Sequence, residues 1–303
     1  MKKSIIYSLS LIFSILFIAA CVNPNKYDLR YNLQKGDSFI QTVDMDMTSS
    51  VMGHEVKITM NASVGMDVVD IQDGIYQIST AYRSMKMSSE SETMQMRFDT
   101  ENPDAYPQSA AFSRIMQAMV NVPFDVEMDR QGKVVEISGF ENLQKAIIDA
   151  AAGSAEEMSK QIAMQMSEQQ FSEEQLKEMF SQFRNIYPVH PIKIGDSWEA
   201  TDSRNMNGME LAMTAKYTLQ AVEGNIATVA VSGKFDAQSS AISTAQGDIS
   251  TTIDGHLSGT TNINLENGMA IAGNLLTSID ATMDIGGRNV EQKTVVKMQL
   301  KSE

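Results

Sequence analysis

The chain has 303 residues, a formal net charge of −14, one cysteine and three histidines. Such an acidic chain lacks the basic surface that binds nucleic acid, so we expect no nucleic-acid partner. The scarcity of histidine and cysteine argues against a zinc or iron centre, and we expect neither a metal nor a cofactor. Methionine, with 23 residues, is the unusual component of the composition.

The N-terminus carries the features of an export signal. Two lysines precede an almost wholly apolar run, residues 5–20, which is too short for a membrane span and ends in small residues. The tetrapeptide Ile18-Ala19-Ala20-Cys21 resembles the lipobox of bacterial lipoproteins, in which the cysteine is lipidated. Lipidation also explains a lone cysteine in an exported chain. We therefore predict a signal peptide at residues 1–20 and a lipid on Cys21.

A polar tether, residues 21–26, would join the lipid to the folded part of the chain. Multiple acyl chains on one residue anchor a protein stably in a membrane. Neither an aspartate nor an acidic cluster follows the cysteine, which favours an outer-membrane anchor that faces the periplasm. The sequence thus predicts that the membrane is a partner through the lipid on Cys21, in the bacterial cell envelope.

Residues 27–139 alternate between polar and apolar side chains, the pattern of antiparallel strands with one buried face. The alternation begins at residues 27–33, and its clearest stretch is 56–68. Asp73-Gly74 is a hairpin signal. Apolar residues at helical spacing predict a short amphipathic helix over 112–119. We interpret this region as a first β unit.

Residues 140–191 form a different kind of segment. They lack strand-like alternation and are rich in Ala, Glu, Gln, Met and Lys, which favour helices. Apolar stripes predict three helices, the last of them capped by Ser172 with Gln175 at the capping-box position. We interpret this region as a helical insertion.

The first pattern returns in residues 192–303, a second β unit. Apolar residues again occupy every second position over 209–221. The turn Gly195-Asp196-Ser197-Trp198 matches the early turn Gly36-Asp37-Ser38-Phe39. A final hairpin is expected across Gly286-Gly287.

Several such matches in one order indicate an internal duplication, roughly 27–139 and 192–275. The expected fold is mainly β (α+β), with antiparallel sheets that form two related, duplicated β units with a helical insertion between them.

The order of these features resembles a family of uncharacterised bacterial lipoproteins, a domain of unknown function. The resemblance rests on the lipobox, the early turn, the β region, the helical stretch and above all residues 191–199, which end in GDSWE. That family carries no assigned chemistry. The resemblance therefore implies a location in the cell envelope and a mainly β architecture with a helical insertion. It implies no catalytic residue.

The Gly-Asp-Ser turns also invite comparison with lipases and esterases of the GDS type. Those enzymes are α/β proteins that pair the serine with an Asp-x-x-His motif, whereas this chain has Asp254-Gly255-His256 in a β region. Glycine and aspartate equally suit a tight turn. We expect the protein not to be an enzyme, and an envelope hydrolase that uses Ser38 or Ser197 is the alternative.

Methionine pairs are a second alternative site, because paired thioethers hold Cu(I). In a strand, spacing two places both sulfurs on one face. Methionine also fills adaptable apolar surfaces, which is the other interpretation. The pairs are Met45 with Met47, Met85 with Met87, Met94 with Met96, and Met164 with Met166. His54, His190 and His256 are scattered and are interpreted as surface or turn residues.

An apolar groove is the third candidate. Curved sheets covered by amphipathic helices form the hydrophobic cavities of lipid carriers, and the Met- and Ala-rich helices of the insertion would suit a mobile cover. The simpler alternative is that these helices only close the core. We predict an envelope lipoprotein with a non-catalytic binding or interaction role, whose partner is an apolar ligand or an envelope protein.

Overall fold

The computed structural model describes residues 25–93, 95–181, 187–206, 209–238, 242–244, 247–285 and 288–303. In the first half of the chain the strands are β1 (Ser38–Val51), β2 (His54–Gln72), β3 (Ile75–Glu90), β4 (Gln95–Asp99), β5 (Phe124–Asp129) and β6 (Val134–Ser138). In the second half they are β7 (Ser197–Met206), β8 (Met209–Glu223), β9 (Ile226–Gln238), β10 (Ile242–Thr244), β11 (Gly247–Asn264), β12 (Ala270–Ile285) and β13 (Arg288–Ser302). The helices are the 3-10 turn Pro107–Ser109, α1 (Ala110–Gln117), α2 (Phe140–Gly153), α3 (Glu157–Gln170) and α4 (Glu173–Ser181).

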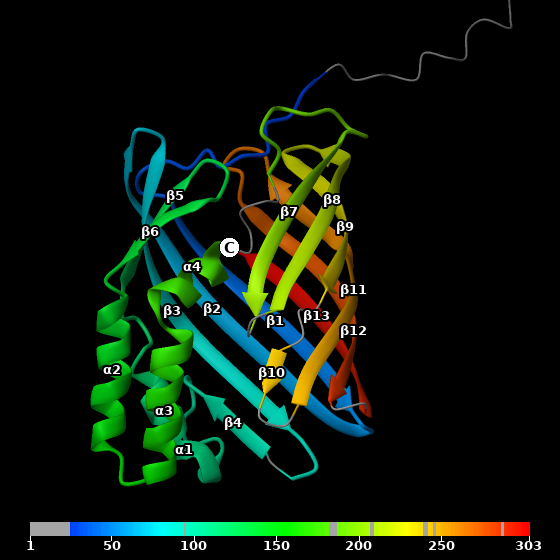
Figure 1. Cartoon of the computed structure of the whole chain (residues 1–303). Coiled ribbons are helices and arrows are strands. Elements are labelled where there is room, and N and C mark those ends of the chain that lie inside the picture. Colours follow the sequence, from blue (N-terminus) through cyan, green and yellow to red (C-terminus); the bar gives the residue numbers. More distant parts are fainter. Residues whose placement is uncertain are drawn as a thin grey trace, which may run out of the picture.

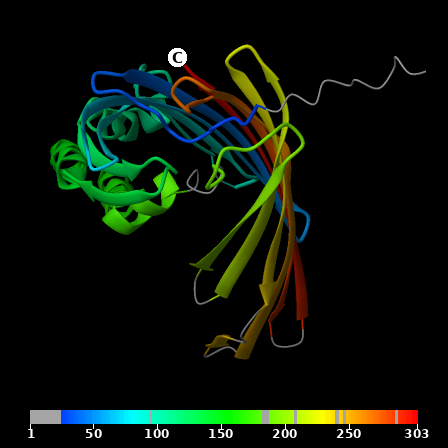
Figure 2. The same ribbon diagram turned by 90° about the horizontal axis from the view of Figure 1, so that it is seen from above.

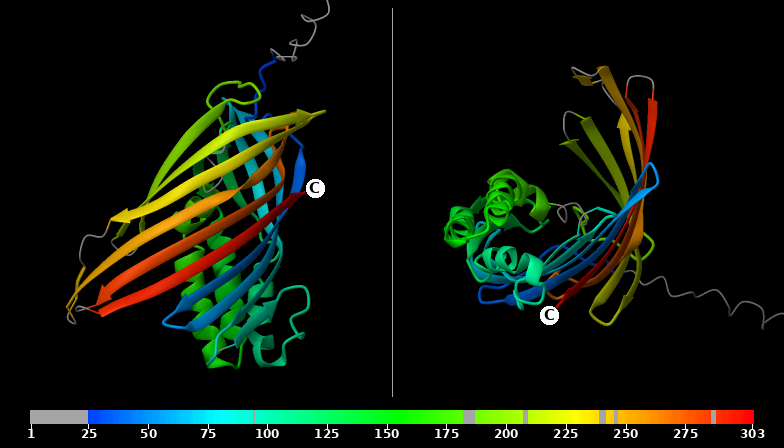
Figure 3. Two further views of the ribbon diagram at one scale, coloured as in Figure 1. Left: turned by 90° about the vertical axis from the view of Figure 1, so that its right-hand side faces the viewer. Right: turned by 90° about the horizontal axis from the view of Figure 1, so that it is seen from below.

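The described strands pair into one antiparallel, 13-stranded sheet in the order β6-β5-β3-β2-β1-β13-β12-β11-β9-β8-β7, with β4 on β3 and β10 on β11 (Figure 1). The last strand, β13, lies between the two halves and joins β1 to β12. Figures 2 and 3 show that the sheet curls into an open trough. Helices α1 to α4 lie inside the trough, on the side of the first-half strands.

The alternation of the sequence gives the sheet one apolar and one polar face, because successive side chains of a strand point to opposite sides. On β13, Val296, Met298 and Leu300 face into the trough and are at least partly buried. Lys297 and Lys301 are exposed on the outside of the same strand. The inner face of the trough is therefore apolar, and its outer face is polar.

Among the described residues, two groups of buried side chains form the core. The first group joins both halves of the sheet, because Leu29 of the N-terminal segment packs with strand residues such as Val68 of β2 and Leu219 of β8. The second group lies between the helices and β3 to β6, where Leu143 and Ile147 of α2 pack with sheet residues and are fully buried.

The mainly β, antiparallel architecture predicted from the sequence is confirmed, and so are the helical segment and the short helix before it. The Ser172 hydroxyl accepts a hydrogen bond from the backbone N–H of Gln175 at 3.3 Å, as a helix cap does. The Gly286-Gly287 turn of the expected final hairpin lies outside the described residues.

Residues 27–33 differ from the expected strand. Leu29, Tyr31 and Leu33 are buried, but the backbone forms only an isolated bridge between Tyr27 and Ile192. Further along, Tyr31 N–H donates to the Arg130 carbonyl at 2.9 Å and Asn32 N–H donates to the Asn267 carbonyl at 2.9 Å. The segment thus crosses the end of the trough and bonds to hairpin turns, so side-chain alternation arises without a sheet ladder.

The turn before β1 is built around Asp37. Gly36 N–H donates to the Val68 carbonyl at 2.9 Å, and the N–H of Val68 donates to the Asp37 carbonyl at 2.8 Å. The Asp37 carboxylate accepts the backbone N–H of Gln34 at 2.8 Å. Gly36 has a φ of 94°, a conformation that favours glycine.

The turn before β7 has the same hydrogen bonds. Gly195 N–H donates to the Leu219 carbonyl at 2.8 Å, and the N–H of Leu219 donates to the Asp196 carbonyl at 3.1 Å. The Asp196 carboxylate accepts the backbone N–H of Lys193 at 2.9 Å, and Gly195 has a φ of 91°. Both Gly-Asp-Ser sequences therefore form one type of turn, in which the aspartate fixes the backbone.

Candidate functional site

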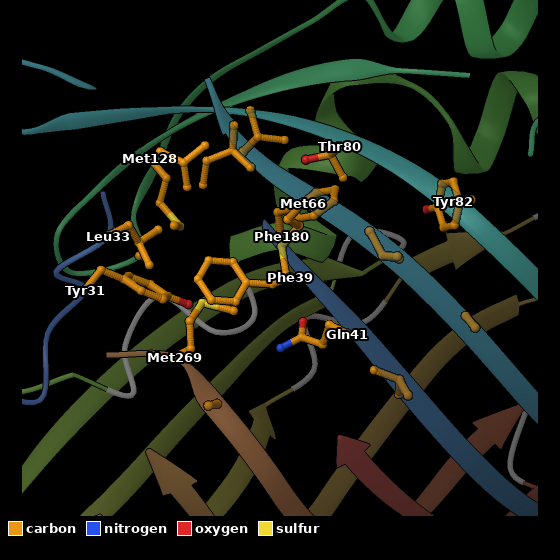
Figure 4. Close-up of a pocket in the computed structure, with 18 of the residues that line it drawn as sticks. Tyr31, Leu33, Phe39, Gln41, Met66, Thr80, Tyr82, Met128, Phe180 and Met269 are labelled. Atoms are coloured by element: carbon orange, nitrogen blue, oxygen red, sulfur yellow. The ribbon is translucent and has the colours of Figure 1, made fainter. Parts of the chain in front are cut away.

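A cavity of about 310 Å³ lies in the trough, over the inner face of β1, β2 and β3 (Figure 4). The N-terminal segment and the turn between β11 and β12 close one side, and α4 contributes Phe180. Nearly all of its lining side chains are aliphatic, aromatic or methionine. They are Tyr31, Leu33, Phe39, Gln41, Val43, Met45, Met60, Ala62, Val64, Met66, Val68, Ile78, Thr80, Tyr82, Val126, Met128, Gly132, Phe180, Met269, Ala270 and Met298.

A row of methionines crosses the floor of the cavity. Met298 of β13 stands opposite Met45 of β1, and Met45 stands opposite Met60 of β2; all three line the cavity. Directly opposite residues on neighbouring strands have their side chains about 5 Å apart on one face. Unbranched thioether side chains repack easily, so this floor can adapt to the shape of what lies on it.

The helical cover reaches the cavity through aromatic contacts. The Phe180 ring of α4 meets the ring of Phe124 edge-on at 5.8 Å between centroids. Tyr82 lies 6.2 Å from Phe124 and 6.1 Å from Phe171, so the cover and the sheet share one aromatic cluster. Figure 4 shows Phe180 with Phe39 and Met66 among the side chains that line the cavity.

Polar groups are few in the lining, and no Asp, Glu, Lys, Arg or His is among the described residues that form it. Burial raises the pKa of the Tyr31 and Tyr82 hydroxyls, so both stay neutral. The Thr80 side chain is buried, and its hydroxyl has no hydrogen-bond partner among the described residues. The part of the lining that the structure describes is therefore uncharged, and it includes one buried hydroxyl without a hydrogen-bond partner, that of Thr80.

The apolar inner face continues beyond the cavity along the second half of the sheet. Leu275 of β12 stands opposite Met298, and Leu257 of β11 stands opposite Thr277. Leu257, Leu275 and Ile279 are all partly exposed. The cavity thus opens on an apolar strip along the trough.

The serines of the two turns lie away from the cavity. Ser38 precedes the lining residue Phe39 on β1 and so points to the outer face, where its hydroxyl donates to Asp67 at 2.5 Å. The Ser197 hydroxyl lies 2.8 Å from that of Thr218. The structure does not bring these serines together with the histidines that the hydrolase alternative requires.

The three histidines occupy separate places. His54 follows the turn between β1 and β2 and hydrogen-bonds Glu92 at 3.0 Å, as expected for a turn residue. His256 lies on β11, 3.6 Å from Asp254, and His190 is exposed in the loop before β7. In the part of the chain that the structure describes, no group of three or more His, Cys, Asp or Glu is placed to hold a metal ion.

Of the predicted methionine pairs, Met45 and Met47 share the inner face of β1, since they stand opposite Met298 and Val296 on β13. Met164 is exposed on α3, a helix, so its pair with Met166 does not share a strand face. Met94 lies outside the described residues. Met85 and Met87 share the inner face of β3, opposite Ala62 and Met60 of β2. The cavity floor gathers further methionines, Met45, Met60 and Met298, from three different strands.

Cys21 and the predicted signal peptide lie outside the described residues. Within the described part, the helices are too short or too polar to cross a membrane. In the sequence, Thr80 is one position within the alternating stretch of residues 27–139. The signal that distinguishes it is a hydroxyl at an inward, apolar position of that stretch.

Comparisons with known proteins give a family. The profile of a family described as a family of unknown function (DUF6263) matches residues 73–270, more than half of the chain. No curated protein sequence matches this chain.

Among solved structures the likenesses are distant. A structure on lipid–protein interactions in lipovitellin has a TM-score of 0.48 at 10% identity, and covers 90% of this chain and 25% of its own, so this chain spans about a quarter of lipovitellin. The β domain of the Bordetella autotransporter BrkA has a TM-score of 0.22 at 7% identity, covering 88% of this chain and 99% of its own. The translocator domain of NalP from Neisseria meningitidis has a TM-score of 0.19 at 6% identity, covering 89% and 90%. These likenesses carry no argument about function.

Proposed function

We propose that this chain, which belongs to the DUF6263 family of unknown function, is an envelope lipoprotein that binds an apolar ligand in its cavity without converting it. The cavity carries the proposal. Protein interiors are close-packed, with few voids larger than a water molecule. A volume of about 310 Å³ falls within the range of small-molecule sites, roughly 300–1,000 Å³.

The chemistry of the lining supports a hydrocarbon chain as the ligand. Moving each methylene group from water into such a site contributes about 0.8 kcal/mol. The row that contains Met45, Met60 and Met298 gives a floor that adapts to bends in a chain. The helical insertion then acts as the cover of the site, with Phe180 as its contact.

The position of both serines supports a non-catalytic role. Ser38 is on the outer face of the sheet and hydrogen-bonds Asp67, so a ligand in the cavity would not meet its hydroxyl. We expect Ser38→Ala and Ser197→Ala to retain ligand binding. Loss of an ester-hydrolysing activity in either variant, with the fold intact, would favour the hydrolase alternative.

The lipobox supports the proposed location in the cell envelope. A lipid on Cys21 would hold the folded domain at a membrane through the short tether, facing the periplasm from the outer membrane. A globomycin-type inhibitor of signal removal should leave a precursor that retains residues 1–20. Normal processing in its presence would count against lipidation.

We infer further that the two β units arose by duplication. Besides the matched turns, β2 and β8 each carry a register shift just after the residue that bonds the turn, Val68 in one and Leu219 in the other. The strand orders β6-β5-β3-β2-β1 and β12-β11-β9-β8-β7 also run in the same direction across the sheet.

Filling the cavity tests the proposed function. Ala62 lines the floor, and Ala62→Phe places a ring in the empty space. We expect the variant to fold, to lose binding of the neutral fluorescent probe N-phenyl-1-naphthylamine, and to lose any lipid mass in native mass spectrometry. Ala230→Phe is the matched control, because Ala230 lies between Thr218 and Thr260 on the neighbouring strands, away from the cavity. A wild-type protein that binds no probe and carries no lipid would refute ligand binding.

A further inference from the structure

Among the described residues of the cavity lining, Thr80 has the one hydroxyl that is buried without a hydrogen-bond partner. Thr80 lies on β3, opposite Met66 of β2 and Phe124 of β5, with only 1% of its surface exposed. Across the described residues, the other buried side-chain atom without a hydrogen bond is Nε1 of Trp198, which is not part of the cavity lining. Figure 4 shows Thr80 among the lining side chains near Met66.

An unpaired buried hydroxyl is costly, at roughly 1–3 kcal/mol, so a position that only packs would favour an apolar residue. The second β unit has an apolar residue at the equivalent position. Val68 and Leu219 occupy equivalent positions in the two units, and their partners on the next strand are Ile78 and Val229. Thr80 lies two residues after Ile78, and Val231 lies two residues after Val229. Thr80 and Val231 are therefore equivalent positions. Valine has the shape of threonine without the hydroxyl. Val231 is buried in the filled core, whereas Thr80 borders the cavity.

The lining also limits which polar group such a ligand can carry into the cavity. An ionised group buried there would face no opposite charge among the described residues of the lining, which is far more costly than burying a neutral group. A neutral oxygen, by contrast, would need a single hydrogen-bond partner. Thr80 can donate to a carbonyl or ether oxygen and can both donate to and accept from a hydroxyl.

We propose that Thr80 selects ligands whose hydrocarbon chain carries an uncharged oxygen, an ester carbonyl or a hydroxyl, inside the cavity. The inference rests on the proposed function, since it specifies the class of ligand that the cavity takes. The ligand class is a neutral lipid such as an ester or long-chain alcohol, in preference to an alkane or an ionised fatty acid.

Competition binding on the full chain tests the selection. Decane, decan-1-ol, methyl decanoate and decanoate each displace N-phenyl-1-naphthylamine from wild-type protein and from Thr80→Val. We expect wild-type protein to prefer the alcohol and the ester over decane and decanoate, and Thr80→Val to lose roughly tenfold in affinity for the alcohol and the ester while keeping its affinity for decane. Thr80→Val should also have a higher denaturant midpoint, because it removes an unpaired hydroxyl.

Val231→Thr is the matched control. It places the same hydroxyl at the corresponding position of the filled core, and it should lower the denaturant midpoint while leaving the ligand preferences unchanged. If Thr80→Val keeps the preference for the oxygen-bearing ligands, or if wild-type protein shows none, Thr80 does not select the ligand although apolar binding stands. If the fluorescent probe itself fails to bind wild-type protein, the proposed function is refuted and the inference with it.

Discussion

The two β units share a backbone plan and differ on their inner faces. In the first unit Phe39 and Met66 stand opposite each other at the edge of a cavity. In the second unit the corresponding pair, Trp198 and Tyr217, stacks with ring centroids 5.5 Å apart. The turns and register shifts depend on backbone hydrogen bonds and one aspartate, so they tolerate different side chains. The inner face depends on side-chain volume, and there the units diverge.

The helical cover is the second difference. The helices follow the first unit in the chain and pack back on its strands, with Leu143 and Ile147 of α2 in the same buried cluster as Phe124. In the first unit the helices therefore cover the inner face of the sheet, and the cavity lies between the two. In the second unit, partly exposed residues such as Leu257 and Leu275 line the open part of the trough. The cavity therefore lies where the helices cover the sheet and the facing side chains, such as Phe39 and Met66, leave space between them.

The largest effect should come from removing the anchor of the cover. Leu143→Ala deletes a fully buried side chain of α2 and should lower the free energy of unfolding by about 3 kcal/mol. Because the helices hold Phe180 over the cavity, it should also weaken binding of N-phenyl-1-naphthylamine. Urea denaturation and probe titration measure the two effects.

Two control variants distinguish the effect of losing the helical cover from the effect of a general loss of stability. Ile148→Ala, on the same helix but 42% exposed, should change the stability by less than about 0.5 kcal/mol. Val229→Ala in the core that joins the halves should destabilise the protein yet leave probe binding in place, because Val229 does not line the cavity. Equal loss of binding in Val229→Ala and Leu143→Ala would contradict a separate role for the cover.

A smaller effect tests the equivalence of the units. Asp37→Ala and Asp196→Ala each remove a carboxylate that accepts one backbone N–H in the turn. Each should cost about 1 kcal/mol, and the two costs should agree because the hydrogen bonds are the same. Measured by urea denaturation, a difference of more than about 1 kcal/mol would show that only one turn organises its unit.

The smallest effect concerns alkaline pH. Burial raises the pKa of the Tyr217 hydroxyl from 10.0 to about 12. The neutral hydroxyl is favoured in the folded state, so its contribution to stability is fully present below pH 10 and is lost as the pH rises through 12. Tyr217 stacks on Trp198, the one tryptophan, and a tyrosinate there quenches its fluorescence. We expect the emission to hold at pH 10 and to fall near pH 12, and Tyr217→Phe should remove that fall. Quenching near pH 10 in the folded protein would contradict the burial of this hydroxyl.

Local sequence patterns, such as apolar alternation and helix capping, predicted much of the fold. Alternation at 56–68 predicted β2, and the capping signal at Ser172 predicted the start of α4. Alternation misled at 27–33, because a segment that lies across the end of a sheet also buries every second side chain. The sequence raised an apolar groove as a candidate site but did not indicate its place, since the floor combines residues of β1, β2, β3 and β13.

By itself the sequence determined the polar outer face, the apolar inner face and the repeated turn, because each depends on residues that are near neighbours in the chain. Only the tertiary structure decided that both units share one sheet through β13, and that the helices roof one half of it. Those outcomes depend on contacts between residues far apart in sequence, whose closeness no local period records. The same holds for Thr80, because only the packing of strands and helix places it in the cavity lining without a hydrogen-bond partner among the described residues.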